Sequence, residues 1–318
     1  MRTRMILPMA LMAELLLSVP GSTFGQDQPL DHKTDQANWI LFERANAMAA
    51  QREFGQALQL YKEAISQGGR FPEAEVGIGD VYFEEGELEL ARQQYEKAYS
   101  LRSAFSIADS KYDVLYKLGS LFESQEMFRL MEDSLTKIVN DDRKYGDPAS
   151  AYLKAQVERN YLERGIDHTL LLYQMSVPFA QEAHSKLGWF YYRTGRFSQA
   201  ISHLLYSVIY VTKDIEDYLH EQDVEYGFSS LPNLMAAVDQ DKRASGFVSG
   251  SSYFKDIYYL AGSSFAAGYP THATLLWKIL ASSRSSGQYA QLAARQLKTP
   301  WTERLLGTDK SSAGQKQN

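Results

Sequence analysis

Two glycines, Gly77 and Gly79, are the first residues in this sequence whose type and spacing could do chemistry. A Gly-x-Gly pair holds a dinucleotide phosphate when it opens a Gly-x-Gly-x-x-Gly element that follows a buried strand and precedes an acidic residue about 20 positions on. Tyr82 stands where the third glycine belongs, and the preceding letters GGRFPEAE do not form a strand pattern. We therefore expect these glycines not to bind a nucleotide.

Side chains that could hold a metal or attack a substrate are scattered along the chain. The six histidines show no His-x-x-x-His spacing, and the cluster of His220, Glu221 and Asp223 is typical of a solvated acidic helix end. Two Ser-x-x-Lys matches, Ser134 to Lys137 and Ser252 to Lys255, lack the Lys-Thr-Gly element that accompanies them in enzymes. The chain has no cysteine, hence no thiolate or disulfide. We expect no catalytic residue, no metal, no cofactor and no enzymatic activity.

The first 25 residues have the pattern of a secretory signal peptide. The basic stretch MRTRM precedes the apolar run ILPMALMAELLLSV, and Thr23-Phe24-Gly25 offers small residues for cleavage. We expect cleavage after Gly25 and an exported, periplasmic protein; the alternative is an uncleaved segment that anchors the chain in the membrane. The formal net charge of −6, with no basic patch, argues against a nucleic-acid partner.

Small and aromatic residues recur along the chain with a period of 34. Each copy reads small, aromatic, turn residue, alanine, aromatic, small, and the copies that start at residues 45, 79 and 188 keep this order most closely. Such a period predicts a stack of similar helical units. The matching positions are Ala45, Met48, Arg52, Ala57, Tyr61 and Ala64; Gly79, Tyr82, Gly86, Ala91, Tyr95 and Ala98; Gly119, Phe122, Glu126, Met131, Leu135 and Ile138; Gly188, Tyr191, Gly195, Ala200, Leu204 and Ser207; and Ala261, Ser264, Gly268, Ala273, Trp277 and Leu280.

This pattern resembles the tetratricopeptide repeat family, whose 34-residue unit is a helix, a turn and a second helix. Leu187-Gly188 with Tyr191 matches the family signature residue by residue. The resemblance implies an all-α fold, a right-handed superhelical solenoid of antiparallel helix pairs. Gly79 would let two helices approach, Gly86 would take the left-handed backbone that ends a helix, and Gly77 would have no role. The predicted packing residues are Ala45, Ala57, Tyr61, Gly79, Gly86, Ala91, Tyr95, Gly188, Ala200, Ala261 and Ala273.

The spacing between copies predicts how the chain is organised. Between Gly119 and Gly188 there is room for one degenerate repeat, whereas the stretch after the copy at Gly188 is acidic and loses the pattern. We therefore expect a signal peptide at 1–25, a linker at 26–37, two well-matched repeats at 38–105, degenerate repeats at 106–180, a well-matched repeat at 181–213, an irregular acidic insertion at 214–250, a degenerate repeat with a capping helix at 251–298, and a mostly disordered tail at 299–318.

The resemblance also implies a binding groove, because the first helices of such repeats build a concave surface on the face away from the small packing residue. Those positions are markedly aromatic here, and exposed aromatic side chains are common anchors of binding surfaces. Some family members bind a peptide carboxylate with Lys and Asn side chains. We do not expect this mode of binding here, because Phe42 replaces the lysine and Asp80 replaces the second asparagine. The candidates are Trp39, Phe42, Asn46, Asp80, Phe83, Tyr116, Trp189, Tyr192, Arg193, Tyr258 and Phe265.

These observations predict a non-enzymatic scaffold or adaptor of the bacterial cell envelope that binds a protein or peptide through the aromatic groove. The alternative is an apolar small-ligand binder that acts with a periplasmic transporter, which would require the aromatic residues to enclose a pocket. We expect no nucleic-acid partner, and membrane contact only through an uncleaved signal segment or through a partner.

Overall fold

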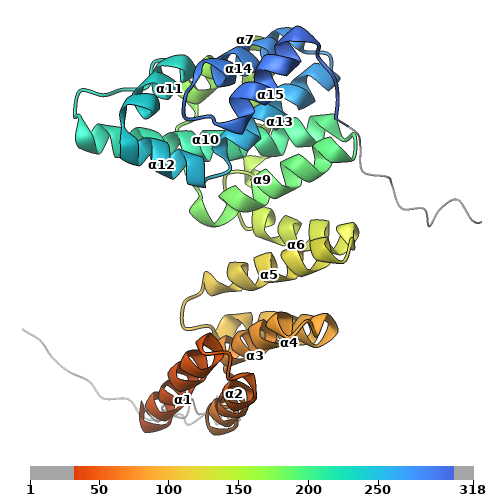
Figure 1. Ribbon diagram of the computed structural model, residues 1–318, viewed down its shortest axis with the longest axis vertical. Coiled ribbons are helices and arrows are strands. Elements are labelled where there is room, and N and C mark those ends of the chain that lie inside the picture. Colours follow the sequence, from red (N-terminus) through yellow and green to blue (C-terminus); the bar gives the residue numbers. More distant parts are fainter. Residues whose placement is uncertain (1–31, 304–318) are drawn as a thin grey trace, which may run out of the picture.

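The computed structural model describes residues 32–303, with side chains from residue 37 on, and this part of the chain is built from fifteen α-helices (Figure 1). They are α1 (His32–Ala50), α2 (Phe54–Gly68), α3 (Pro72–Glu84), α4 (Leu88–Ser100), α5 (Ser110–Ser124), α6 (Phe128–Asn140), α7 (Ala151–Arg164), α8 (Ile166–Leu172), α9 (Pro178–Arg193), α10 (Phe197–Gln222), α11 (Leu231–Gln240), α12 (Lys242–Gly250), α13 (Tyr253–Ala266), α14 (Pro270–Ser282) and α15 (Gln288–Lys298). The predicted all-α architecture of consecutive helix pairs is confirmed.

The two ends of the chain differ in part from the prediction. Residues 32–37 belong to α1, so the predicted linker is helical from His32 on. Residues 299–303 of the predicted tail are described and folded against the protein, as set out below. The predicted signal peptide and residues 304–318 lie outside the described residues. Between residues 32 and 303, no helix combines the length and the apolar character needed to cross a bilayer.

The first six helices form three pairs stacked on one another, α1 with α2, α3 with α4, and α5 with α6 (Figure 1). A turn residue with left-handed backbone separates the two helices of each pair: φ is 62° at Arg52, 80° at Gly86 and 58° at Glu126. The later pairs α9–α10 and α13–α14 have the same turn at Gly195 and Gly268, with φ of 76° and 91°. Glycine adopts this backbone freely and other residues at a cost, which explains why three of these five positions are glycine.

Small residues lie where the helices cross. A Cβ atom added to Gly79 would lie 2.6 Å from the Tyr95 ring, and one added to Gly188 would lie 2.5 Å from Leu204. The prediction for Gly77 was wrong, because a Cβ atom there would lie 2.4 Å from the Tyr61 ring. The Gly-x-Gly pair therefore admits one tyrosine from each flanking helix. Of the other predicted packing residues, Ala45, Ala57, Tyr61, Ala91, Tyr95, Ala200, Ala261 and Ala273 are all buried.

The degenerate repeat predicted between α6 and α9 does not lie between them. Helix α6 packs directly against α9, and the α7–α8 pair lies beside the C-terminal helices instead (Figure 1). The Tyr161 hydroxyl of α7 is 2.7 Å from Oγ of Ser264 in α13, and Nε2 of His272 in α14 is 2.8 Å from the Tyr161 backbone oxygen. Because Tyr161 is fully buried, α7 is part of the C-terminal core.

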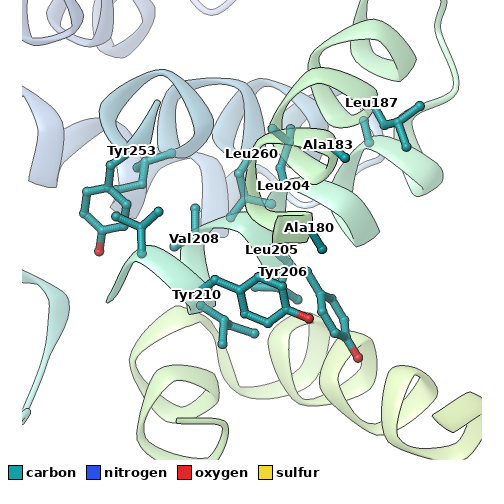
Figure 2. Packing of buried hydrophobic residues seen from close by; sticks show 14 of the residues in the cluster. Ala180, Ala183, Leu187, Leu204, Leu205, Tyr206, Val208, Tyr210, Tyr253 and Leu260 are labelled. Carbon is teal, nitrogen blue, oxygen red and sulfur yellow. The ribbon is translucent and has the colours of Figure 1, made fainter. Parts of the chain in front are cut away.

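The segment predicted as an irregular insertion at 214–250 is mostly helical. Helix α10 continues through this region to Gln222, and α11 and α12 follow. Their apolar faces are buried, with Leu231 and Leu234 of α11 and Val248 of α12 in the core. The acidic residues of 214–225 obscured this pattern because they lie among the buried positions of α10, and one of them, Glu216, is itself buried. Figure 2 shows the centre of this core, where Tyr206 and Tyr210 of α10 lie between neighbouring helices.

Candidate functional site

A cleft of about 450 Å³ lies between the first helices of the second and third pairs. It contains three of the predicted groove residues, Asp80 and Phe83 from α3 and Tyr116 from α5. Asp80 lies three residues before Phe83 and four before Glu84, so these side chains share one face of α3, and this face lines the cleft. The full lining is Asp80, Phe83, Glu84, Tyr95, Tyr116, Lys117 and Ser120.

Phe83 supplies the apolar surface of this α3–α5 cleft. Its side chain is 40% exposed, although phenylalanine is usually buried. No buried hydrophobic cluster includes it among the described residues. An exposed aromatic ring beside a cleft is a common anchor point for a binding partner.

Charged groups of both signs surround Phe83. Nζ of Lys117 lies 2.7 Å from Oδ1 of Asp80, and the Tyr95 hydroxyl donates to the same oxygen at 2.7 Å. Burial, with the nearby Asp80 carboxylate, raises the pKa of Tyr95, so this hydroxyl stays a donor. Glu84 adds a second carboxylate, 3.7 Å from Arg52 on the preceding repeat. The cleft therefore offers the exposed Phe83 ring beside two tyrosines, one ammonium group and two carboxylates.

Tyr95 fixes the Asp80 carboxylate from inside the fold. The same arrangement occurs one repeat earlier, where the Tyr61 hydroxyl donates to Oδ1 of Asn46 at 2.7 Å. In both repeats the tyrosine of the second helix passes the glycine of α3 and reaches the polar residue of a first helix. The repeat period thus places a polar group at the same point of α1 and of α3.

Tyr116 has a structural role as well as a place in the cleft. Its hydroxyl donates to the Phe179 backbone oxygen at 2.8 Å and accepts from the Ala183 backbone nitrogen at 2.9 Å. Burial raises the pKa of Tyr116, so the phenol stays protonated. Its ring lines the cleft while its hydroxyl ties α5 to α9.

The aromatic candidates of α1, Trp39 and Phe42, lie together at the N-terminal end of the stacked helix pairs. Trp39 is 37% exposed, and its ring centroid lies 5.3 Å from that of Phe42 and 4.9 Å from that of Phe71. Trp39 also lines a separate cleft of about 420 Å³ that includes Arg70 and Glu73. Trp39 and Phe42 therefore do not share a cleft with Phe83.

The C-terminal candidates are mostly not open to solvent. Tyr192 and Tyr258 are 1% and 2% exposed, so placing them on an accessible groove was wrong. Trp189 is half-buried with the Arg193 guanidinium 5.8 Å from its ring centroid, and Phe265 packs against Trp277. Aromatic residues at helical spacing are expected on core and groove faces alike, and only the neighbouring elements decide between them.

Sequence reasoning missed Lys117 altogether and assigned Tyr95 to packing alone. One signal was present, because Lys117 follows the groove residue Tyr116 and lies on a first helix. The contact between Lys117 and Asp80 joins helices of different repeats, so no single-repeat pattern reveals it.

A second cluster of titratable groups is enclosed at the junction of α6, α7, α9 and α10. The His184 and His203 Nδ1 atoms are 3.1 Å apart, and Nε2 of His203 is 3.0 Å from the Tyr145 hydroxyl. Asp142, buried beside them, accepts from the Tyr210 hydroxyl and lies 3.5 Å from Nε2 of His184. Burial lowers the pKa of both histidines. These groups are buried, so we assign them to the core, and among the described residues no group is arranged to hold a metal ion.

The comparison with protein-family models agrees with the repeat pattern of the first two helix pairs. Residues 42–105 match the tetratricopeptide repeat family model. An uncharacterized protein of Treponema pallidum (strain Nichols) is 21% identical over 253 residues, which cover 78% of this chain and 66% of that protein, just under two thirds of its length. The crystal structure of YrrB, described as a tetratricopeptide repeat protein with an unusual peptide-binding site, is similar at 16% identity and a TM-score of 0.40, over 80% of this chain and 90% of that one. This chain therefore carries tetratricopeptide repeats at residues 42–105, within an all-α fold of consecutive helix pairs.

Proposed function

We propose that this protein is a non-enzymatic adaptor that binds a protein or peptide partner through the α3–α5 cleft. The observation that carries the proposal is the exposed Phe83 ring, with Asp80 and Lys117 beside it on the groove-facing helices of adjacent repeats. Tetratricopeptide repeats characteristically present such helices to other proteins.

The lining of the cleft favours a peptide over an apolar solute. An apolar ligand would cover Asp80, Glu84 and Lys117 without giving them hydrogen-bond partners, and this is costly for charged groups. A peptide with one apolar side chain and charged neighbours would satisfy Phe83 and the charged groups together. The apolar-solute alternative therefore finds less support in this cleft.

The proposed location is the cell envelope, after export and cleavage behind Gly25. Support for it comes from the basic and apolar stretches of the first 25 residues. A periplasmic adaptor with acidic net charge would meet its partner in an oxidising compartment, where a chain without cysteine has no thiol to oxidise.

The test compares the protein with a Phe83→Ala variant as baits for an extract of the bacterial envelope. A protein retained by the unchanged chain and lost by the variant is then purified, and its dissociation constant is measured with both. Removing a central aromatic anchor costs about 2 kcal/mol or more, which corresponds to roughly 30-fold weaker binding.

The matched control is Phe247→Ala, which removes an exposed phenylalanine from α12, on a different part of the protein. Binding should be unchanged in this control, and both variants should keep the helical circular dichroism of the unchanged chain. Equal retention of every captured protein by the Phe83→Ala variant would refute the role of the cleft. An apolar small molecule found in the eluate by mass spectrometry, with no protein, would favour the alternative.

A further inference from the structure

The chain segment after α15 folds back onto α9 and α13. The Glu303 backbone nitrogen donates to the Tyr192 hydroxyl at 3.0 Å, a contact between residues 111 positions apart. The Glu303 carboxylate lies 3.6 Å from the Arg193 guanidinium and 3.4 Å from the Tyr259 hydroxyl. One residue of this segment thus has both its backbone and its charge recognised by distant helices.

The buried side chain of Gln296 holds the same segment by its backbone. The Trp301 nitrogen donates to Oε1 of Gln296 at 2.9 Å, and Nε2 of Gln296 donates to the Trp301 oxygen at 3.1 Å. The backbone groups of Trp301 and Glu303 are bonded in this way, while the Trp301 ring and the Thr302 side chain are exposed. Alternation of this kind is how proteins bind an extended peptide, with main-chain hydrogen bonds at every second residue.

The contacts of residues 301 and 303 do more than terminate α15, because they involve other helices. Gln296 belongs to α15 itself, but Tyr192 and Arg193 belong to α9 and Tyr259 to α13. Tyr192 and Arg193 are also among the groove positions predicted from the repeat pattern. Here the predicted groove is covered by the chain's own extended and acidic segment.

We propose that Tyr192, Arg193, Tyr259 and Gln296 form a binding site for an extended acidic segment of a protein, and that residues 301–303 occupy this site as a ligand in cis. The site binds the backbone groups of two residues that lie two positions apart, together with the carboxylate of the second residue. The inference goes beyond the proposed function, because it concerns a second site whose test does not involve the α3–α5 cleft, so that either proposal can fail alone.

A tethered segment competes strongly with any external one. A short tether gives an effective local concentration on the order of 1 mM, so a peptide that binds the open site with a dissociation constant of about 100 μM or less would appear roughly 10-fold weaker or more against the intact chain. Releasing residues 301–303 should therefore reveal affinity that the intact chain conceals.

The experiment measures the fluorescence anisotropy of a labelled peptide of residues 299–303 with capped ends, whose one charged side chain is Glu303. It compares the full-length chain with a full-length Trp301→Pro/Glu303→Pro variant, which loses both backbone donors and the Glu303 carboxylate. We expect the variant to bind the peptide at least about 10-fold more tightly than the intact chain. A matched control, Thr302→Ala, alters the exposed residue between the two recognised ones and should behave like the intact chain.

Two further changes test the chemistry of the site. Adding Arg193→Ala to the released variant, or making Glu303→Gln in the peptide, removes the ion pair between these two residues and should weaken binding by about 2- to 5-fold. Equal binding by intact and released chains, or no binding by a released chain with unchanged circular dichroism, would overturn the proposal.

A measurement on the intact chain covers the case in which the released variant does not fold. The backbone N–H groups of Trp301 and Glu303 are bonded to side chains, so their hydrogen exchange should be slow, and about 1 mM unlabelled peptide should accelerate it by displacing the segment. Exchange that is unchanged by the peptide would refute the exchangeable ligand and leave residues 301–303 as a fixed cap.

Discussion

Alanine in place of Gly79 is expected to lower the free energy of unfolding by about 1–3 kcal/mol, the usual range for an overpacked core position. The added Cβ atom would lie 2.6 Å from both Cδ1 and Cε1 of Tyr95, much closer than carbon atoms approach in proteins. The Tyr95 ring is buried and its hydroxyl is bonded to Asp80, so the ring cannot move away without losing that hydrogen bond. The substitution should therefore loosen the α3–α4 crossing.

Two other glycines separate this packing effect from backbone effects. Gly55 lies in α2 with no atom within 4 Å of an added Cβ, so Gly55→Ala should be neutral or stabilising, by up to about 1 kcal/mol. Gly86 has equally free space but a φ of 80°, so Gly86→Ala should cost about 1–2 kcal/mol through the backbone alone. The three substitutions are chemically identical and differ only in their surroundings.

The assay is urea denaturation followed by far-ultraviolet circular dichroism for all three variants. Because stacked repeats need not unfold in one step, amide hydrogen exchange in α3 and α4 then locates the loss of stability. A Gly79→Ala variant as stable as Gly55→Ala would refute the reasoning. In a Tyr95→Leu background, where the ring is absent, the penalty of Gly79→Ala should shrink.

Three further changes probe other parts of the structure. Glu126→Gly should raise stability by about 1 kcal/mol, because glycine adopts the 58° φ of this turn without strain; a lower urea midpoint would contradict this. Tyr116→Phe should lower stability by about 1–3 kcal/mol, since its hydroxyl joins two backbone groups of α9; a change below 0.5 kcal/mol in the same assay would contradict that tie. His184 and His203 have lowered pKa values in the folded state, so the unfolded chain binds more protons. Their contribution to stability is present above about pH 6.5 and is lost as the pH falls below it; urea midpoints equal at pH 7.5 and 5.5 would refute this.

The repeat period was enough to predict which residues meet within a helix pair. Small residues, the tyrosines that pack on them and the left-handed turns all follow from contacts less than one repeat apart, and the sequence pattern records such contacts. The placement of Asp80 and Phe83 on one side of α3 follows from the helical period, since they lie three residues apart. Gly77 was misjudged because the family pattern specifies only one of the two glycines.

The repeat period did not predict contacts between segments that are far apart in the sequence. Tyr192 and Tyr258 have the spacing of groove residues, and only the C-terminal segment and the neighbouring helices decide that they are buried. Helix α7 likewise was expected to begin a degenerate repeat, yet the partners of its Tyr161 in α13 and α14 lie more than 100 residues away. Periodicity describes which face of a helix is apolar, but it does not say which element covers that face.

The position of α7 has a consequence for the order in which the chain can fold during synthesis. The first two helix pairs pack against helices that are close in sequence, and each can form soon after it has left the ribosome. Tyr161 has no completed environment until Ser264 and His272 have also emerged. Helix α7 must therefore wait, with its apolar face uncovered, while roughly a hundred further residues are made. During that interval the uncovered face of α7 is an apolar surface that favours aggregation of the nascent chain.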